Sequence, residues 1–155
     1  MSQDRTQFLK QRVLLEARTW VGTSFRHQGR AKKTFEHPGG VDCIGLLVGV
    51  ARELQLRDEA GKLLHDYDMP NYSRIGIGER LIETLEKHFY KTDSIAPSNV
   101  LLFAFAGQPQ HLGIIGEDKD GLTLIHAYDS NGKVVEHGLS DKWLKRAIGV
   151  YQWRF

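Results

Sequence analysis

The hydrophobic period of the chain changes near its middle, and this change limits the possible folds more than any other feature. Up to about residue 90, apolar residues recur at three- and four-residue steps, which predicts helices over 5–21, 43–54 and 79–89. The later segments are short, rich in β-forming residues and separated by turn residues: VLLFAFAG, HLGIIG, LTLIHAY, KVVEHG and AIGVYQWRF. Helices followed by strands predict an α+β fold, with helices packed on one face of an antiparallel sheet.

The composition fits one folded domain over residues 1–155. Hydrophobic residues make up 41% of the chain and charged residues 26%, as in a globular core. The net charge of +2 is too small to indicate a nucleic-acid partner. Charges interrupt every apolar run near the N-terminus, and no run approaches the roughly 20 residues of a membrane span. We therefore expect synthesis in the cytoplasm without a signal peptide, and delivery of the protein by another component.

The only cysteine, Cys43, lies at the expected start of the second helix, in GGVDCIGLLVGV. Asp42 is the candidate N-cap, and a lone cysteine forms no internal disulfide. The free N–H groups and dipole of a helix N-terminus favour negative charge, so we expect a lowered thiol pKa and a nucleophilic thiolate. We also expect Gly45 to leave room for a substrate above the first turn. The alternative is a buried structural cysteine, and helix position alone leaves both interpretations open.

Two histidines on neighbouring predicted strands are candidates for the base. A four-residue hairpin loop over 117–120 would place His111 directly opposite His126, with both side chains on one face. One more loop residue would put the two rings on opposite faces. In the expected register, His111 is the base for Cys43 and His126 fixes its tautomer. The alternative is two ordinary half-buried strand histidines.

The other histidines lack such a setting. His27 and His37 lie in the long loop before the cysteine, where they line a cleft or face solvent. We expect His88 to be a cation at the end of the third helix, and His137 to face solvent. With one cysteine and scattered histidines, we expect no metal site and no cofactor.

The order of these segments resembles the NlpC-type papain-like cysteine peptidases, which are peptidoglycan endopeptidases. The resemblance covers nearly the whole chain and is carried by RTWVGTSFRHQG, VDCIGLLVGVARELQL, APSNVLLF, HLGIIG and LIHAYDSNGKVVEHGL. It implies a papain-like NlpC-type fold with N-terminal helices on a C-terminal sheet and the nucleophile at a helix N-terminus. The tail SDKWLKRAIGVYQWRF and the His-Gln-Gly run resemble the branch associated with phage and prophage tails.

The resemblance also implies a function and roles for single residues. Cys43 would be the nucleophile, His111 the general base and then acid, His126 the orienting residue, and the Cys43 N–H part of the oxyanion hole. The substrate would be the peptide stem of bacterial peptidoglycan, typically cut between γ-D-glutamate and a diamino acid, and phage tail proteins would be partners. Further substrate-binding or oxyanion candidates are Asp42, Phe25, Arg26, His27, Ile44 and Gly45.

One departure from the family pattern bears on activity. Phe25 stands where the family often has tyrosine, and one lost transition-state hydrogen bond costs about two to three orders of magnitude in rate. This substitution supports one alternative, a tail-assembly protein that keeps the fold but has little catalytic activity. A second alternative is an acyltransferase that passes a thioester to an amine. In such relatives the histidine often precedes the cysteine, whereas here the cysteine comes first.

Two loops leave their roles open. The basic loop 30–38, including Arg30, either contacts a substrate carboxylate or is a solvated surface. Tyr67, Pro70 and Tyr72 either wall the cleft or pack their loop onto the sheet.

Overall fold

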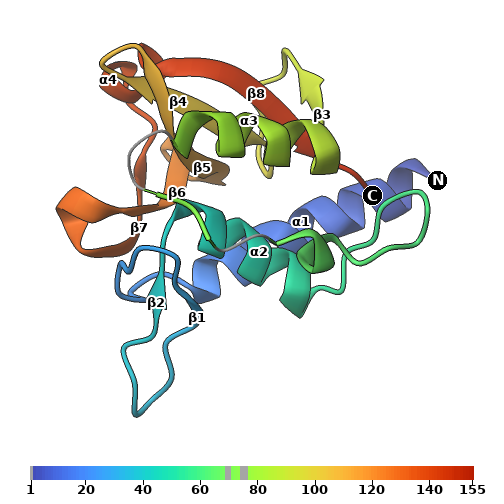
Figure 1. Cartoon of the computed structure of the whole chain (residues 1–155). Coiled ribbons are helices and arrows are strands. Elements are labelled where there is room, and N and C mark those ends of the chain that lie inside the picture. Colours follow the sequence, from blue (N-terminus) through green and yellow to red (C-terminus); the bar gives the residue numbers. More distant parts are fainter. Residues whose placement is uncertain (1, 69–70, 74–76) are drawn as a thin grey trace.

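A six-stranded antiparallel sheet forms the centre of the computed structural model, which describes residues 2–68, 71–73 and 77–155. Its spatial order is β3-β8-β4-β5-β6-β7 (Figure 1). The strands are β3 (Phe89–Thr92), β4 (Val100–Phe105), β5 (Gln108–Asp118), β6 (Gly121–Tyr128), β7 (Lys133–Gly138) and β8 (Ala147–Trp153). The helices are α1 (Gln3–Thr19), α2 (Cys43–Glu53), α3 (Ile77–His88) and α4 (Asp141–Leu144), with 3-10 turns η1 (Leu64–Tyr67) and η2 (Asp129–Asn131). The α+β prediction is confirmed.

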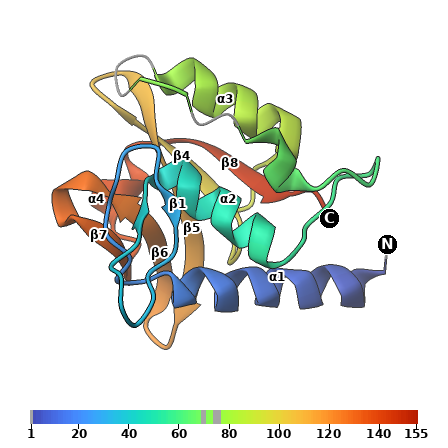
Figure 2. The ribbon, with the colours of Figure 1, turned by 60° about the horizontal axis from the view of Figure 1, so that its bottom comes forward.

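The sheet separates two apolar clusters. The larger cluster joins α1, α2 and α3 to strand residues such as Leu112, Ile114 and Ile125. Figure 2 shows α1 and α2 running side by side, with α3 on the other side of α2. On the opposite face, Phe103 and Leu124 pack with neighbours that include Trp143 of α4. The three long helices therefore share one face as predicted, and the short α4 covers the other.

Helix α2 is buried along most of its length, because nearly every turn carries apolar side chains. Its buried residues are Cys43, Ile44, Gly45, Leu46, Leu47, Gly49, Val50 and Ala51. A helix that is apolar on all sides belongs inside a core, and α2 accordingly contacts α1, β5 and β6. None of the described helices has the length and apolar character to cross a bilayer. The burial of α2 fixes its N-terminus, and with it Cys43, against one end of the sheet.

Three short strands were missed by the sequence prediction. Strand β3 begins at Phe89, where the third helix was predicted to end, and it pairs with β8. The expected loop 22–42 contains the two-stranded pair β1 (Arg30–Ala31) and β2 (Gly40–Val41). The segment between these two strands projects away from the rest of the molecule (bottom of Figure 1).

Close packing between α1 and α2 depends on a glycine. A Cβ at Gly49 would lie 2.3 Å from two atoms of the Trp20 ring, and this ring is fully buried. Overpacking of this kind costs about 1–3 kcal/mol of stability. The higher helix propensity of alanine than of glycine offsets about 1 kcal/mol of this loss. We therefore expect Gly49→Ala to lower the free energy of unfolding by about 1–2 kcal/mol in urea melts. Gly138→Ala is the control, because a Cβ there meets no atom within 4 Å; an equal loss in both variants would contradict the packing explanation.

Candidate active site

The hydrogen-bonded ladder of β5 and β6 ends before either strand does, and the candidate site lies beyond its last pair. Their ladder ends at the pair Ile114–Ile125, although β5 begins at Gln108 and β6 continues to Tyr128. The first residue of α2 approaches this end of β5, since the backbone of Leu112 hydrogen-bonds to its thiol. The N-terminus of α2 thus lies against this hairpin, although the helix is distant from it in sequence.

A pocket of about 290 Å³ lies at this end of the two strands. Cys43 and His111 both line it, so the structure brings together the predicted nucleophile and the predicted base. The other lining residues are Phe25, His27, Asp42, Ile77, Phe105, Gln110, Ala127, Tyr128 and Asp129. Polar groups gathered in one largely apolar pocket are typical of a binding or active site.

Cys43 is almost completely buried where it lines this pocket. Only 5% of the residue is exposed, and it packs into the large apolar cluster. The predicted lowering of its pKa is wrong. Burial, and then the negative charge of Asp42, raise the pKa of Cys43 to about 12, while backbone hydrogen bonds from Leu112 and Ile44 act in the opposite direction without cancelling the rise. The resting thiol is therefore protonated, and a thiolate forms only when a base removes its proton.

The two strand histidines share one face of the sheet and are hydrogen-bonded. Nε2 of His111 lies 2.7 Å from Nδ1 of His126. The predicted register is wrong by two residues, because the hairpin loop has two residues, between Asp118 and Gly121, rather than four. A shift of two residues conserves the face on which each side chain lies, so the predicted contact forms along a diagonal instead of directly across.

Gly113 makes room for this diagonal contact. A Cβ at this position would lie 2.5 Å from the Leu124 side chain and 3.2 Å from Cβ of His126. Gly113 lies between His111 and Ile115 on the same face of β5, where most residues would project a side chain. The missing side chain lets the ring of His126 lie beside that of His111.

Both imidazoles are neutral at physiological pH. Burial lowers the pKa of His111 to about 3. Burial, followed by repulsion from His111 and His137, lowers the pKa of His126 to about 2. In the described part of the chain, no protein group hydrogen-bonds to Nδ1 of His111, and no hydrogen bond joins this ring to the thiol. His111 therefore lines the pocket with a free nitrogen that can accept a proton.

A third histidine, His137, extends this hydrogen-bonded pair, and this contact was not predicted from the sequence. Nε2 of His137 lies 2.8 Å from Nε2 of His126, and its Nδ1 lies 2.9 Å from the carbonyl oxygen of Gly138. His137 is partly exposed, so it reaches solvent as predicted, but its ring also has two hydrogen-bond partners that the prediction did not include. Strand β7 pairs His137 with Leu124, diagonal to His126. The loop that joins β6 to β7 has four residues, 129–132, whereas its Asn-Gly pair is typical of a two-residue loop, which would have predicted another register.

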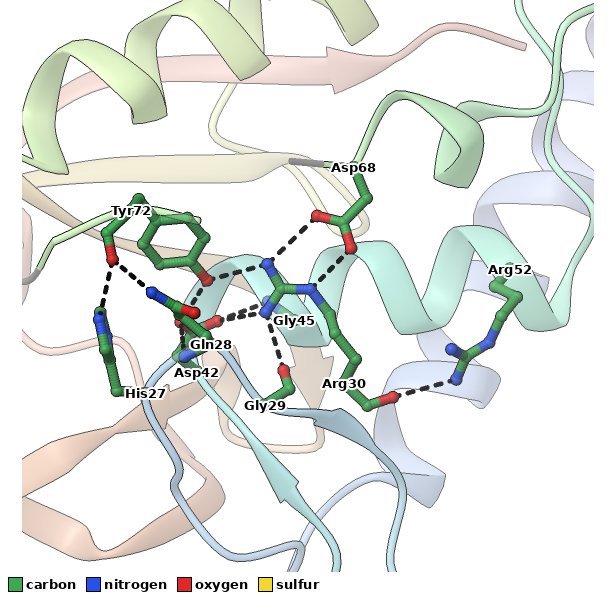
Figure 3. Close-up of polar contacts among 9 residues, drawn as sticks. All are labelled: His27, Gln28, Gly29, Arg30, Asp42, Gly45, Arg52, Asp68 and Tyr72. Atoms are coloured by element: carbon green, nitrogen blue, oxygen red, sulfur yellow. Dashed lines mark hydrogen bonds and ion pairs between the residues drawn. The ribbon is translucent and has the colours of Figure 1, made fainter. Parts of the chain in front are cut away.

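Asp42 is the centre of a buried polar network at the start of α2 (Figure 3). Its Oδ1 accepts the helix-capping bond from the N–H of Gly45 at 2.8 Å, which confirms the predicted N-cap. Its Oδ2 accepts the N–H of Gln28 at 2.8 Å and the hydroxyl of Tyr72. Nη1 of Arg30 donates to Oδ1 at 3.1 Å. The carboxylate thus joins the loop before Cys43 to the helix that carries it.

Arg30 and Tyr72 are structural partners in this network. Nε of Arg30 donates to Asp68 at 2.8 Å, and its Nη2 donates to the hydroxyl of Tyr72 at 2.9 Å. Because Arg30 is largely buried against two carboxylates, it is not free to bind a substrate carboxylate as the loop interpretation suggested. Burial, together with Asp42, raises the pKa of Tyr72, so the phenol stays protonated and donates.

The remaining predicted site residues divide into two groups. Phe25 and His27 line the pocket with Cys43, and Nε2 of His27 lies 3.0 Å from the carbonyl oxygen of Tyr72. Arg26 is exposed and lines a neighbouring groove that His27 also borders. Phe25 and His27 therefore lie at the pocket, and Arg26 lies beside it.

Two predicted residues do not face the pocket. Ile44 is 4% exposed and packs into the core on the side of α3. A Cβ at Gly45 would lie 2.1 Å from the carbonyl oxygen of Gly29, so the chain's own backbone fills the space that was predicted for a substrate. Tyr67 donates its hydroxyl to Asp58, away from the pocket, and Pro70 lies outside the described residues.

His88, at the end of α3, is buried and neutral, so the prediction of a cation at this helix end is wrong. It is 7% exposed, its ring contacts Tyr67, and its Nδ1 has no partner among the described residues. Burial, and then the positive charge of Lys87, lower the pKa of His88 to about 4.

The lowered pKa of His88 predicts a pH-dependent stability. Below about pH 6.5 the unfolded chain binds a proton at this position and the native chain does not, so stability falls with pH until the native pKa is reached. We expect wild type to lose roughly 2 kcal/mol more than His88→Leu between about pH 7 and pH 5 in urea melts. His37→Leu is the control, because His37 is exposed. Equal pH slopes in wild type and His88→Leu would contradict the prediction.

Comparison with known proteins supports the fold. No protein-family model matches the sequence, and no curated protein sequence matches it. Among solved structures, the NlpC/p60 domain of the peptidoglycan hydrolase SagA is similar, at 18% identity and a TM-score of 0.56, covering 92% of this chain and 97% of that one. An N-acetylmuramoyl-L-alanine amidase from Bacteroides uniformis is also similar, at 13% identity and a TM-score of 0.57, covering 94% and 99%. The chain therefore has the fold of the NlpC/p60 domain.

Proposed function

We propose that this protein is a cysteine hydrolase that cuts amide bonds in the peptide stems of bacterial peptidoglycan. One observation carries the proposal: in an NlpC/p60 fold, the first residue of α2 is a cysteine that shares a pocket with a neutral, hydrogen-bonded imidazole. The solved structures with this fold include a peptidoglycan hydrolase and an amidase, which supports the class of substrate. The small pocket suits a short peptide segment.

The resting charges favour attack assisted by a general base. Because the thiol and His111 are both neutral, Nδ1 of His111 takes the thiol proton as the sulfur attacks the amide carbonyl. Nδ1 of His111 then gives this proton to the leaving amine. Water activated by the same ring hydrolyses the thioester and restores the enzyme.

The first turn of α2 supplies a site for the oxyanion. The side chain of Asp42 accepts a hydrogen bond from the N–H of Gly45, and its carbonyl oxygen accepts one from the N–H of Leu46. These bonds leave the N–H of Cys43 to face the negative oxygen of the tetrahedral intermediate. Phe25 lines the pocket without a hydroxyl, so this stabilisation depends on backbone donors.

Bond specificity and delivery form the finer part of the proposal. The family resemblance supports cleavage between γ-D-glutamate and a diamino acid. The resemblance of residues 140–155 to the tail-module branch supports carriage on a phage or prophage tail, which would bring a protein made in the cytoplasm to the cell wall. Purified virions that lack the protein would count against tail carriage.

Digestion of purified peptidoglycan peptides tests the function. Wild type and Cys43→Ala are incubated with the peptides, and the products are separated and identified by mass spectrometry. New amine ends made only by wild type support hydrolysis and identify the bond. Amine conjugates made only by wild type would instead indicate an acyltransferase.

A tail-assembly protein with little catalytic activity is the second candidate. The burial of Cys43 and its raised pKa favour this candidate, because both keep the thiol protonated and a protonated thiol is a poor nucleophile. Unchanged peptides after incubation with wild type, together with the protein in assembled tails, would favour this candidate.

A further inference from the structure

Three imidazoles form a continuous hydrogen-bonded chain from the pocket to the surface. Nε2 of His111 lies 2.7 Å from Nδ1 of His126, and Nε2 of His126 lies 2.8 Å from Nε2 of His137. The chain ends where Nδ1 of His137 lies 2.9 Å from the carbonyl oxygen of Gly138. The first two rings have assigned roles in the proposed mechanism, and the third has none.

The final carbonyl determines where every proton in this chain lies. A carbonyl oxygen only accepts, so Nδ1 of His137 carries the proton and its Nε2 is an acceptor. Nε2 of His126 must then donate to His137, which leaves its Nδ1 to accept from Nε2 of His111. In a chain of neutral rings, Nδ1 of His111 is therefore left without a proton, as the base for the thiol requires.

Exposure increases from the inner rings to the outer ring. His126 is fully buried, His111 is 5% exposed, and His137 is partly exposed. Trp143 covers the chain, with its ring centroid 4.8 Å from that of His126 and 5.8 Å from that of His137. A positive charge is costly on a buried ring and much less costly on a solvated one.

We infer that His137 is a positioning residue of this site: it fixes the tautomers of His126 and His111 and takes up the positive charge that forms when the thiol is deprotonated. The inference rests on the proposed cysteine hydrolase function. The proton is then removed at His111, which lines the pocket with Cys43. The positive charge resides on His137, which is partly exposed and can be solvated by water.

The proton transfers balance along the chain. The S–H bond of Cys43 breaks and its proton binds Nδ1 of His111; the Nε2 proton of His111 then passes to Nδ1 of His126, and the Nε2 proton of His126 passes to Nε2 of His137. The two inner rings end neutral, and His137 ends as an imidazolium that still donates to Gly138. When the amine leaves, His111 gives it the Nδ1 proton while the other transfers reverse, which restores the starting tautomers.

Nitrogen-15 NMR of histidine-labelled protein at neutral pH tests the tautomers without any substrate. We expect wild type to show an unprotonated Nδ1 on His111 and on His126. His137→Leu removes the acceptor, so both rings should become tautomer mixtures. His137→Gln offers a side-chain oxygen to His126 and should keep the wild-type pattern. Fixed wild-type tautomers in His137→Leu would overturn the inference, and so would a protonated Nδ1 on His111 in wild type.

Turnover of a peptidoglycan peptide tests the charge transfer. Neither variant can accept a proton at this position, so we expect kcat to fall about tenfold in His137→Gln and up to about a hundredfold in His137→Leu, with KM unchanged. Wild-type kcat in a folded His137→Leu would overturn the inference. If wild type itself cleaves no peptide, the proposed function fails, while the NMR result still decides whether His137 fixes the tautomers.

Discussion

Cys43→Ala is expected to lower kcat/KM for a peptidoglycan peptide by roughly ten-thousand-fold or more, to the background rate of water attack. Alanine cannot form the thioester, and the pocket holds no second thiol because the chain has a single cysteine. His111→Gln should cause nearly the same loss, because the protonated thiol cannot attack without a base. Residues that act as one unit give similar losses alone and together, so the double variant should be no worse than either single one.

Stability and rate must be measured on the same samples to interpret this result. Alanine at position 43 removes one sulfur from a packed site, so we expect a loss of only about 1 kcal/mol in the free energy of unfolding. His37→Gln is the control, because this exposed histidine lies outside the pocket. A folded Cys43→Ala that retains even a hundredth of the wild-type rate would contradict covalent catalysis and would place the chemistry elsewhere.

Periodicity and turn residues were sufficient to predict the helix-then-strand order, the N-cap at Asp42 and the shared face of the two strand histidines. These features depend on local spacing. The pairing tolerated an error in the hairpin loop because two strand residues return a side chain to the same face, so a shift of two kept His111 and His126 together. A shift of one would have separated them.

The electrostatics could not be predicted from local spacing. A helix N-terminus favours a thiolate, but the burial of Cys43 and the charge of Asp42 act in the opposite direction and prevail. The neutral state of His88 likewise follows from the elements that cover it, and not from its position at a helix end. The contact of His137 with His126 follows from the pairing of β7 with β6, which local spacing does not give.

Arg30 shows the same limit, and it gives the largest expected change in stability. Its basic loop suggested a substrate contact, yet the guanidinium joins Asp42 to Asp68 with 16% of its side chain exposed. Removing one partner of a buried ion pair leaves the other charge unpaired, which costs about 3–5 kcal/mol. Because these groups are not fully buried, we expect Arg30→Met to lower the free energy of unfolding by about 3 kcal/mol, as measured by urea denaturation.

Two comparisons separate the ion pairs from other effects of this change. Arg26→Met makes the same substitution four residues earlier at an exposed position, and it should change stability by less than about 0.5 kcal/mol. Asp68→Leu combined with Arg30→Met removes one of the stranded charges, so the double variant should lose less than the sum of the two single losses. Because Asp42 caps α2 and Arg30 holds its carboxylate, the loss in Arg30→Met should also loosen the helix start and lower kcat with it. Equal stability of Arg30→Met and Arg26→Met would show that Asp42 is held by Gln28, Gly45 and Tyr72 alone, and that the arginine is free for a substrate after all.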